Sequence, residues 1–115
     1  MPPKRNPLGL NPLQLKTLTL LQALARLPEH AQREGDAIRV ANMPPPHGDH
    51  FHLGDAVVAT RDASGLFNEA AWIALERKGL IKSDFPDAAL LTPAGQEYDT
   101  GLLDRIVHQS DHHGH

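Results

Sequence analysis

The chain has 115 residues, 40% of them apolar and 22% charged, a composition typical of one globular domain rather than a disordered chain. It has no cysteine, which excludes a disulfide framework and a thiolate metal site, and no apolar run near the roughly 18 residues that span a bilayer. The formal net charge of −3 gives no overall attraction to nucleic acid. Because the N-terminus also lacks a signal-peptide core, we expect a cytoplasmic protein with no membrane segment.

Histidine and proline are the unusual residues, with eight and ten copies. Some of these prolines, together with the basic pair Lys4 and Arg5, fall within residues 1–10. We interpret this stretch as a flexible N-terminal arm. A single domain is expected over residues 11–108. A flexible, histidine-rich tail is expected over residues 109–115.

The first expected helix begins after Asn11 and ends before Pro28. Asn11 is a favoured N-cap, Pro12 suits the first helical position, and Gln14 is placed to complete a capping box. Leucines at helical spacing give this helix one broad apolar face. The polar residues 30–36 that follow are expected to form a loop.

Two short runs of alternating apolar and polar residues, 37–41 and 50–53, predict strands. We expect them to pair with each other as a hairpin around the proline-rich residues 43–49. The Gly-Asp pair that comes next is interpreted as the cap of a short helix through residues 57–59.

The second strong helix is expected from Leu66 or Asn68 to Lys78, with Asn68 as its cap and Gly79 as its terminator. Helical spacing places four residues on its core face: Asn68, Ala71, Trp72 and Leu75.

Two further strands are expected over residues 80–82 and 88–91, joined by a turn. Thr92 can then cap a last helix that has Pro93 at its first position and continues through the apolar residues of 102–107. The pattern as a whole predicts an α+β fold, mainly helical with a small β-sheet.

Residues 75–81, Leu-Glu-Arg-Lys-Gly-Leu-Ile, and 91–95, Leu-Thr-Pro-Ala-Gly, resemble the second half of a winged helix-turn-helix domain of the MarR type. In that family a recognition helix with a similar ending is followed by a two-stranded wing and a helix opened by Leu-Thr-x-x-Gly. The resemblance is clearest over residues 64–103, and it implies helix 66–78 as the recognition helix and 80–92 as the wing. The Pro/His-rich stretch after the first helix is an addition to this pattern, expected as an extra hairpin or loop.

The resemblance implies a small transcriptional regulator that binds duplex DNA. The outward face of the recognition helix, however, consists of Ala70, Ile73, Ala74 and Arg77, where a groove-reading helix normally presents polar side chains. The wing tip, residues 82–87, carries two acids and one lysine, although phosphate contact favours a basic wing. The sequence therefore favours only weak DNA binding.

Three explanations of this apolar outward face remain open. Its apolar residues are buried in the protein's own dimer or against the extra hairpin, or they contact a protein partner, or they meet DNA. The main alternative to DNA binding is accordingly a winged-helix protein–protein interaction module. The residues expected to contact DNA or a partner are Lys4, Arg5, Asn68, Ala70, Ile73, Ala74, Arg77, Lys78 and Lys82.

A histidine cluster made of His47, His50 and His52, with Asp49 beside it, suggests a metal-binding or metal-sensing protein. Positions 50 and 52 point to the same side of a strand, and imidazole with carboxylate suits zinc or nickel. The alternative is a polar loop whose histidines face water. The four C-terminal histidines, from His108 onward, are expected to bind metal only adventitiously.

No motif in the sequence indicates catalysis. The serines lack a nucleophile-elbow motif, and no phosphate-binding glycine loop or His-Glu-x-x-His pattern occurs. We therefore expect no enzyme activity, and for so small a domain we expect a dimer.

Overall fold

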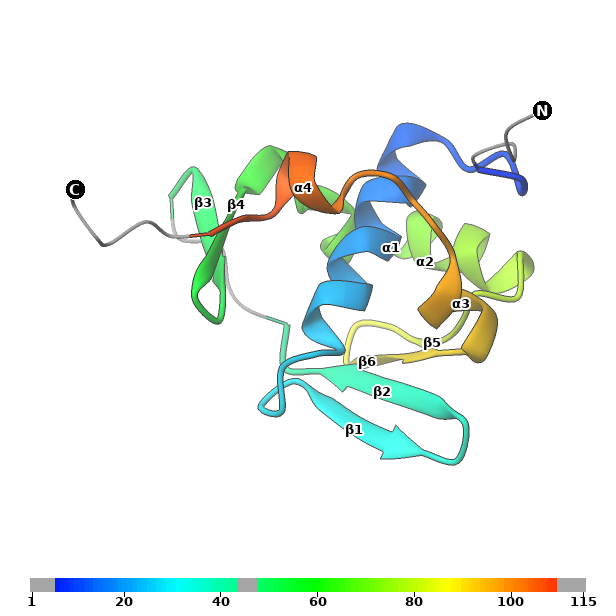
Figure 1. Ribbon diagram of the computed structural model, residues 1–115. Coiled ribbons are helices and arrows are strands. Elements are labelled where there is room, and N and C mark those ends of the chain that lie inside the picture. Colours follow the sequence, from blue (N-terminus) through cyan, green and yellow to red (C-terminus); the bar gives the residue numbers. More distant parts are fainter. Residues whose placement is uncertain (1–5, 44–47, 110–115) are drawn as a thin grey trace.

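The computed structural model describes residues 6–43 and 48–109, and it confirms an α+β fold with small antiparallel sheets. In Figure 1, α1 runs through the middle, with the larger sheet at its lower end and the β3–β4 hairpin to the left. The elements are α1 (Pro12–Leu24), β1 (Ala31–Glu34), β2 (Ala37–Ala41), β3 (His50–Leu53), β4 (Ala56–Ala59), the 3₁₀ helices η1 (Thr60–Asp62) and η2 (Ser64–Phe67), α2 (Glu69–Arg77), β5 (Ile81–Asp84), β6 (Ala88–Leu91), α3 (Pro93–Glu97), α4 (Leu103–Ile106) and β7 (His108–Gln109).

Helix α1 begins as its sequence predicts, with a complete capping box. The Asn11 side chain accepts a hydrogen bond from the Gln14 amide at 2.8 Å, and the Gln14 side chain accepts one from the Asn11 amide at 3.1 Å. The helix ends at Leu24, earlier than the expected stop before Pro28. Its buried residues are Thr17, Leu18, Thr19, Leu20, Leu21 and Leu24.

The described part of the expected N-terminal arm, residues 6–10, lies against the domain. Leu10 is buried in the core, and the Asn6 side chain accepts hydrogen bonds from the Leu10 amide at 2.8 Å and from the Tyr98 hydroxyl at 2.7 Å. This segment therefore belongs to the folded domain rather than to a flexible arm.

The larger sheet has the strand order β1-β2-β6-β5, and all its pairings are antiparallel. The prediction of a loop over residues 30–36 is wrong, because β1 pairs with β2, and a two-residue turn at Gly35 and Asp36 joins the two strands. The expected hairpin between 37–41 and 50–53 is also wrong. Strand β2 pairs with β1 on one side and β6 on the other, which leaves it no edge for β3.

The smaller sheet has the strand order β3-β4-β7. Its β4 strand replaces the short helix expected through residues 57–59. The physical reason is a tight turn at Gly54, whose φ of 59° lies in the left-handed region that favours glycine. Gln109, which is expected in the flexible tail, instead pairs with Ala56 as part of β7.

The single last helix expected after Thr92 is divided into α3 and α4. Thr92 does cap α3, because its hydroxyl accepts a hydrogen bond from the Gly95 amide at 3.1 Å. The helix then ends at Glu97, and Tyr98 is extended. The Gln22 side chain of α1 donates hydrogen bonds to the carbonyls of Gly95 and Tyr98, both at 2.8 Å, which fixes this break in the helix against α1.

The core lies between α1, α2 and the larger sheet, and it extends to the smaller sheet and α4 through Leu53, Ala56, Val58 and Ile106. Its largest fully buried side chain is Trp72, whose indole N–H donates to the Gly65 carbonyl at 3.1 Å and whose ring meets Phe85 edge to face at 5.0 Å. Within the described ranges no helix has the length and apolar content needed to cross a membrane.

Candidate functional site

Helix α2 is positioned by its two ends and by its core face. The Asn68 side chain accepts from the Ala70 amide at 3.0 Å, and Gly79, with φ of 77°, lets the chain turn away after Lys78. Ala71, Trp72 and Leu75 are buried as predicted. Asn68 is exposed rather than part of that core face, because its side chain caps the helix.

The outer face of α2 is apolar at its centre. Ile73 is 39% exposed, Ala70 is exposed, and Ala74 is half-buried beside them. Phe67, which is 47% exposed, ends the 3₁₀ turn just before the helix. Ile73 is thus not covered by the extra hairpin, which was one of the explanations that the sequence left open.

The charges around this face nearly balance. Of the predicted contact residues, Arg77, Lys78 and Lys82 are exposed, while Lys4 and Arg5 lie outside the described residues. Four acidic residues on the same helix and hairpin are exposed as well: Glu69, Glu76, Asp84 and Asp87. A surface with nearly balanced charge and an apolar centre gives little attraction for a phosphate backbone.

Two acids of the helix and hairpin already have partners within the chain. The Glu76 carboxylate accepts a hydrogen bond from the Ser83 amide of β5 at 3.2 Å. Asp84 lies 3.7 Å from the Arg39 guanidinium of β2. These contacts link the β5–β6 hairpin to α2 and to β2.

The predicted metal residues are brought together only in part. His50 and His52 lie on β3 with their rings edge to face and the ring centroids 5.1 Å apart. Asp49 Oδ1 is 3.2 Å from His50 Nδ1, and this hydrogen bond lowers the pKa of the Asp49 carboxyl. His47 lies outside the described residues. Among those that are described, no three His, Asp or Glu side chains are gathered closely enough to hold a metal ion.

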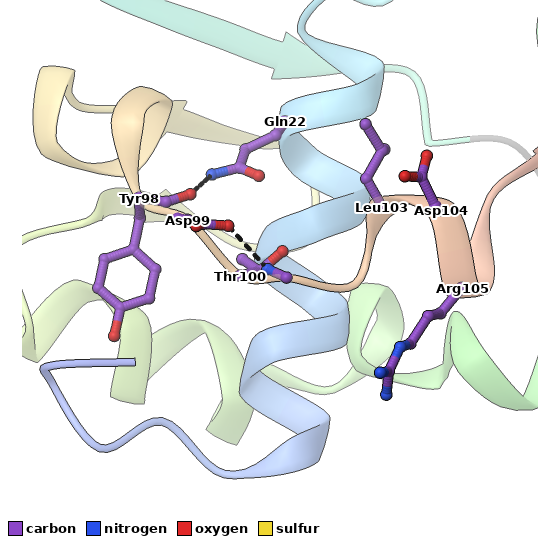
Figure 2. A pocket seen from close by; sticks show the side chains of 8 residues that line it. Gln22, Tyr98, Asp99, Thr100, Leu103, Asp104 and Arg105 are labelled. Carbon is purple, nitrogen blue, oxygen red and sulfur yellow. Dashed lines mark hydrogen bonds between the residues drawn. The ribbon is translucent and has the colours of Figure 1, made fainter. Parts of the chain in front are cut away.

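A cavity of about 430 Å³ lies between α1 and the segment that joins α3 to α4 (Figure 2). The polar groups that line it mostly form hydrogen bonds within the chain. The Gln22 side chain donates to the Tyr98 carbonyl, and the Asp99 carboxylate accepts from the Gly101 amide at 3.0 Å. Asp104 and Arg105 point away from each other in Figure 2, so they do not converge on one ligand. The arrangement is best explained as a support for the broken helix.

Comparison of the chain with protein-family models, with curated proteins and with solved structures finds no match.

Proposed function

We propose that this chain is a winged-helix domain that acts as a protein-docking module, and that its outer α2 face binds a second copy of the chain. The winged-helix assignment is supported by the order of elements. Helix α2 is followed by the antiparallel β5–β6 hairpin and then by α3, which is the order implied by the MarR-like motif. Pairing of β2 with β6 ties this hairpin into the larger sheet.

The observation that carries the docking proposal is the exposure of Ile73 at the middle of α2. A groove-reading helix needs hydrogen-bonding side chains at such positions, whereas Ile73 and its alanine neighbours can only make apolar contacts. Depletion of charge at the centre of a patch, with charged residues around it, is typical of protein interfaces.

The charges at the two ends of α2 favour a second copy as the occupant. Glu69 in the first turn and Arg77 in the last turn each lie four residues from Ile73. If two α2 helices pack antiparallel about a two-fold axis at Ile73, each Glu69 meets the partner's Arg77. The same surface is then complementary to itself, which is the requirement for a closed two-fold dimer.

A nine-residue helix is too small to supply the whole interface, since stable complexes bury about 800 Å² on each partner. The remaining area would have to come from Phe67, which is exposed just before α2, and from the β5–β6 hairpin, which follows it. We therefore expect a dimer centred on α2 and flanked by these two elements.

Replacing Ile73 by aspartate should weaken dimerisation roughly 30-fold or more, because it places charges at the centre of the interface. Sedimentation of the wild-type and I73D chains over a range of concentrations measures this directly. Leu103→Asp is the matched control, since Leu103 is 38% exposed but lies on α4. A wild-type chain that stays monomeric near ~100 µM would contradict the proposal.

Charge reversal at the ends of α2 tests the identity of the occupant. In E69R and in R77E, each homodimer would bring like charges together, so both variants should dissociate. Mixing them in equal amounts should restore a dimer, because each Arg then meets a Glu. Failure of the mixture to reassociate would refute the antiparallel arrangement. If the wild type is instead monomeric and shifts duplex DNA in a salt-dependent way that R77E abolishes, α2 is a DNA-binding helix.

A further inference from the structure

A second cavity, of about 260 Å³, lies between the end of α1, the turn of the β3–β4 hairpin and α4. Its lining is mostly apolar. Leu53 and Ala56 of the hairpin are buried in the core, while Leu27 and Val107 are half-buried against it. Leu103 of α4 lines the same cavity and is 38% exposed. Three distant parts of the sequence thus converge on one apolar cleft.

Two packing contacts hold the walls of this cleft in place. The hairpin turn lies so close to Leu27 that a Cβ added to Gly54 would be 3.2 Å from Leu27 Cδ2. Ile106 of α4 is buried in the core, next to the exposed turn that carries Leu103. The cleft is therefore built into the folded domain, as is usual for sites that bind small molecules.

Two opposite charges, Arg26 and Asp104, line the cleft together with its apolar residues. Both side chains are exposed, and neither forms an ion pair within the described part of the chain. In Figure 2, Leu103 and Asp104 point to the same side of α4, whereas Arg105 points away from them. The cleft therefore offers apolar contacts together with one cation and one anion.

We propose that this cleft binds a free amino acid with an apolar side chain, of about the size of phenylalanine. The ligand's side chain lies against Leu27 and Leu103, its carboxylate meets Arg26, and its ammonium group meets Asp104. An apolar anion would be attracted by Arg26 but repelled by Asp104, and for an apolar cation the two effects are reversed. A zwitterion is the class of ligand that satisfies both charges.

The size of the cleft agrees with this class of ligand. A cavity of about 150 Å³ accommodates benzene. The volume of about 260 Å³ therefore leaves room for a ring together with the amino and carboxyl groups. The residues that line this cleft lie outside α2, so binding of the amino acid does not depend on the dimer proposed above.

The first test is an NMR titration of the full chain with L-phenylalanine, followed by the backbone amide shifts. A ligand of about a dozen non-hydrogen atoms in a surface cleft is expected to bind with a Kd on the order of 1 mM. The shifts should saturate and be largest around Leu27, Leu53 and Leu103. Ala23→Leu places a larger side chain in the cleft and suits a helix, so it should abolish the shifts while the chain stays folded.

The second test uses ligands that each lack one charge. Hydrocinnamate is phenylalanine without its ammonium group, and phenethylamine is phenylalanine without its carboxylate. Each should bind up to about fivefold more weakly than phenylalanine. R26A should weaken the binding of phenylalanine but not of phenethylamine, and D104N should weaken the binding of phenylalanine but not of hydrocinnamate. R105A is the matched control, because Arg105 is exposed beside Asp104 and does not line this cleft.

Several results would overturn the proposal. One is the absence of saturable shifts with L-phenylalanine up to ~20 mM. If hydrocinnamate binds as tightly as phenylalanine and D104N has no effect, the cleft takes an apolar anion instead. Equal binding of phenethylamine, together with an R26A variant that behaves as the wild type, would assign the cleft to an apolar cation. If R105A weakens the binding of phenylalanine as much as R26A does, the charge effect does not arise in the cleft.

Discussion

Replacing Gly95 by alanine is expected to lower the free energy of unfolding by about 3 kcal/mol. A Cβ at this position would overlap the backbone carbonyl oxygen of Leu80 and press on the Leu91 side chain. The carbonyl cannot move away cheaply, because it accepts hydrogen bonds from the Thr92 amide and hydroxyl. The glycine of the Leu-Thr-x-x-Gly motif is thus explained by the close approach of α3 to the start of the β5–β6 hairpin.

Urea denaturation followed by circular dichroism measures this change. The sign of the change in the free energy of unfolding is informative, because a glycine-to-alanine change within a helix normally stabilises the helix by up to about 1 kcal/mol. The neighbouring Ala94→Gly is a suitable control, since Ala94 is exposed and its loss should cost no more than about 1 kcal/mol. An equal or raised stability of G95A would show that α3 does not pack so closely on Leu80.

Replacing Trp72 by alanine is expected to cost about 3–5 kcal/mol, comparable with the whole stability of many small domains. The indole ring is fully buried and contacts the Phe85 ring edge to face, and its N–H donates to the Gly65 carbonyl. Its removal leaves a cavity between α2 and its neighbours, and the Gly65 carbonyl then keeps only the Asn68 amide as a donor.

Trp72→Phe separates these contributions. It keeps an aromatic ring and loses the N–H. The loss of this one hydrogen bond is expected to cost about 1 kcal/mol, since the Gly65 carbonyl still accepts from the Asn68 amide. Chemical denaturation at low protein concentration, read by circular dichroism, keeps any dimerisation out of the measurement. Ile73→Ala on the exposed face should change stability by no more than about 0.5 kcal/mol. Equal stabilities of W72A and I73A would contradict the placement of α2.

The helical parts of the fold could be predicted from sequence because their signals are local. The Asn11 and Gln14 capping box marks the start of α1, and helical spacing identifies the buried face around Trp72. The end of the last helix was missed, because its break after Glu97 depends on hydrogen bonds from Gln22, more than 70 residues earlier. Such a long-range contact leaves no local pattern.

The β1–β2 and β3–β4 hairpins were missed for a different reason, whereas the β5–β6 pair was predicted. Gly35-Asp36 and Gly54-Asp55 are two-residue turns between strands, and glycine followed by aspartate is a recognised signal for them. The second pair was instead interpreted as a helix cap. Strand β1 carries no apolar alternation because its residues after Ala31 face water on both sides of an edge strand.

The candidate surfaces differ in how far sequence could define them. The outer face of α2 follows from helical spacing around Ile73, which the exposure of that residue matches. That His108 shares a face of the smaller sheet with His50 and His52 could not be predicted, because it follows only from the pairing of β4 with both β3 and β7. Strand register between distant segments is a tertiary property.

Both edges of the larger sheet carry features that disfavour the addition of another strand. Strand β1 presents Gln32, Arg33 and Glu34 to solvent, and a charged edge resists pairing with another chain. On the other edge, the Ser83 amide of β5 is already taken by the Glu76 carboxylate. Copies of this protein are therefore not expected to grow into a filament by adding strands to the larger sheet.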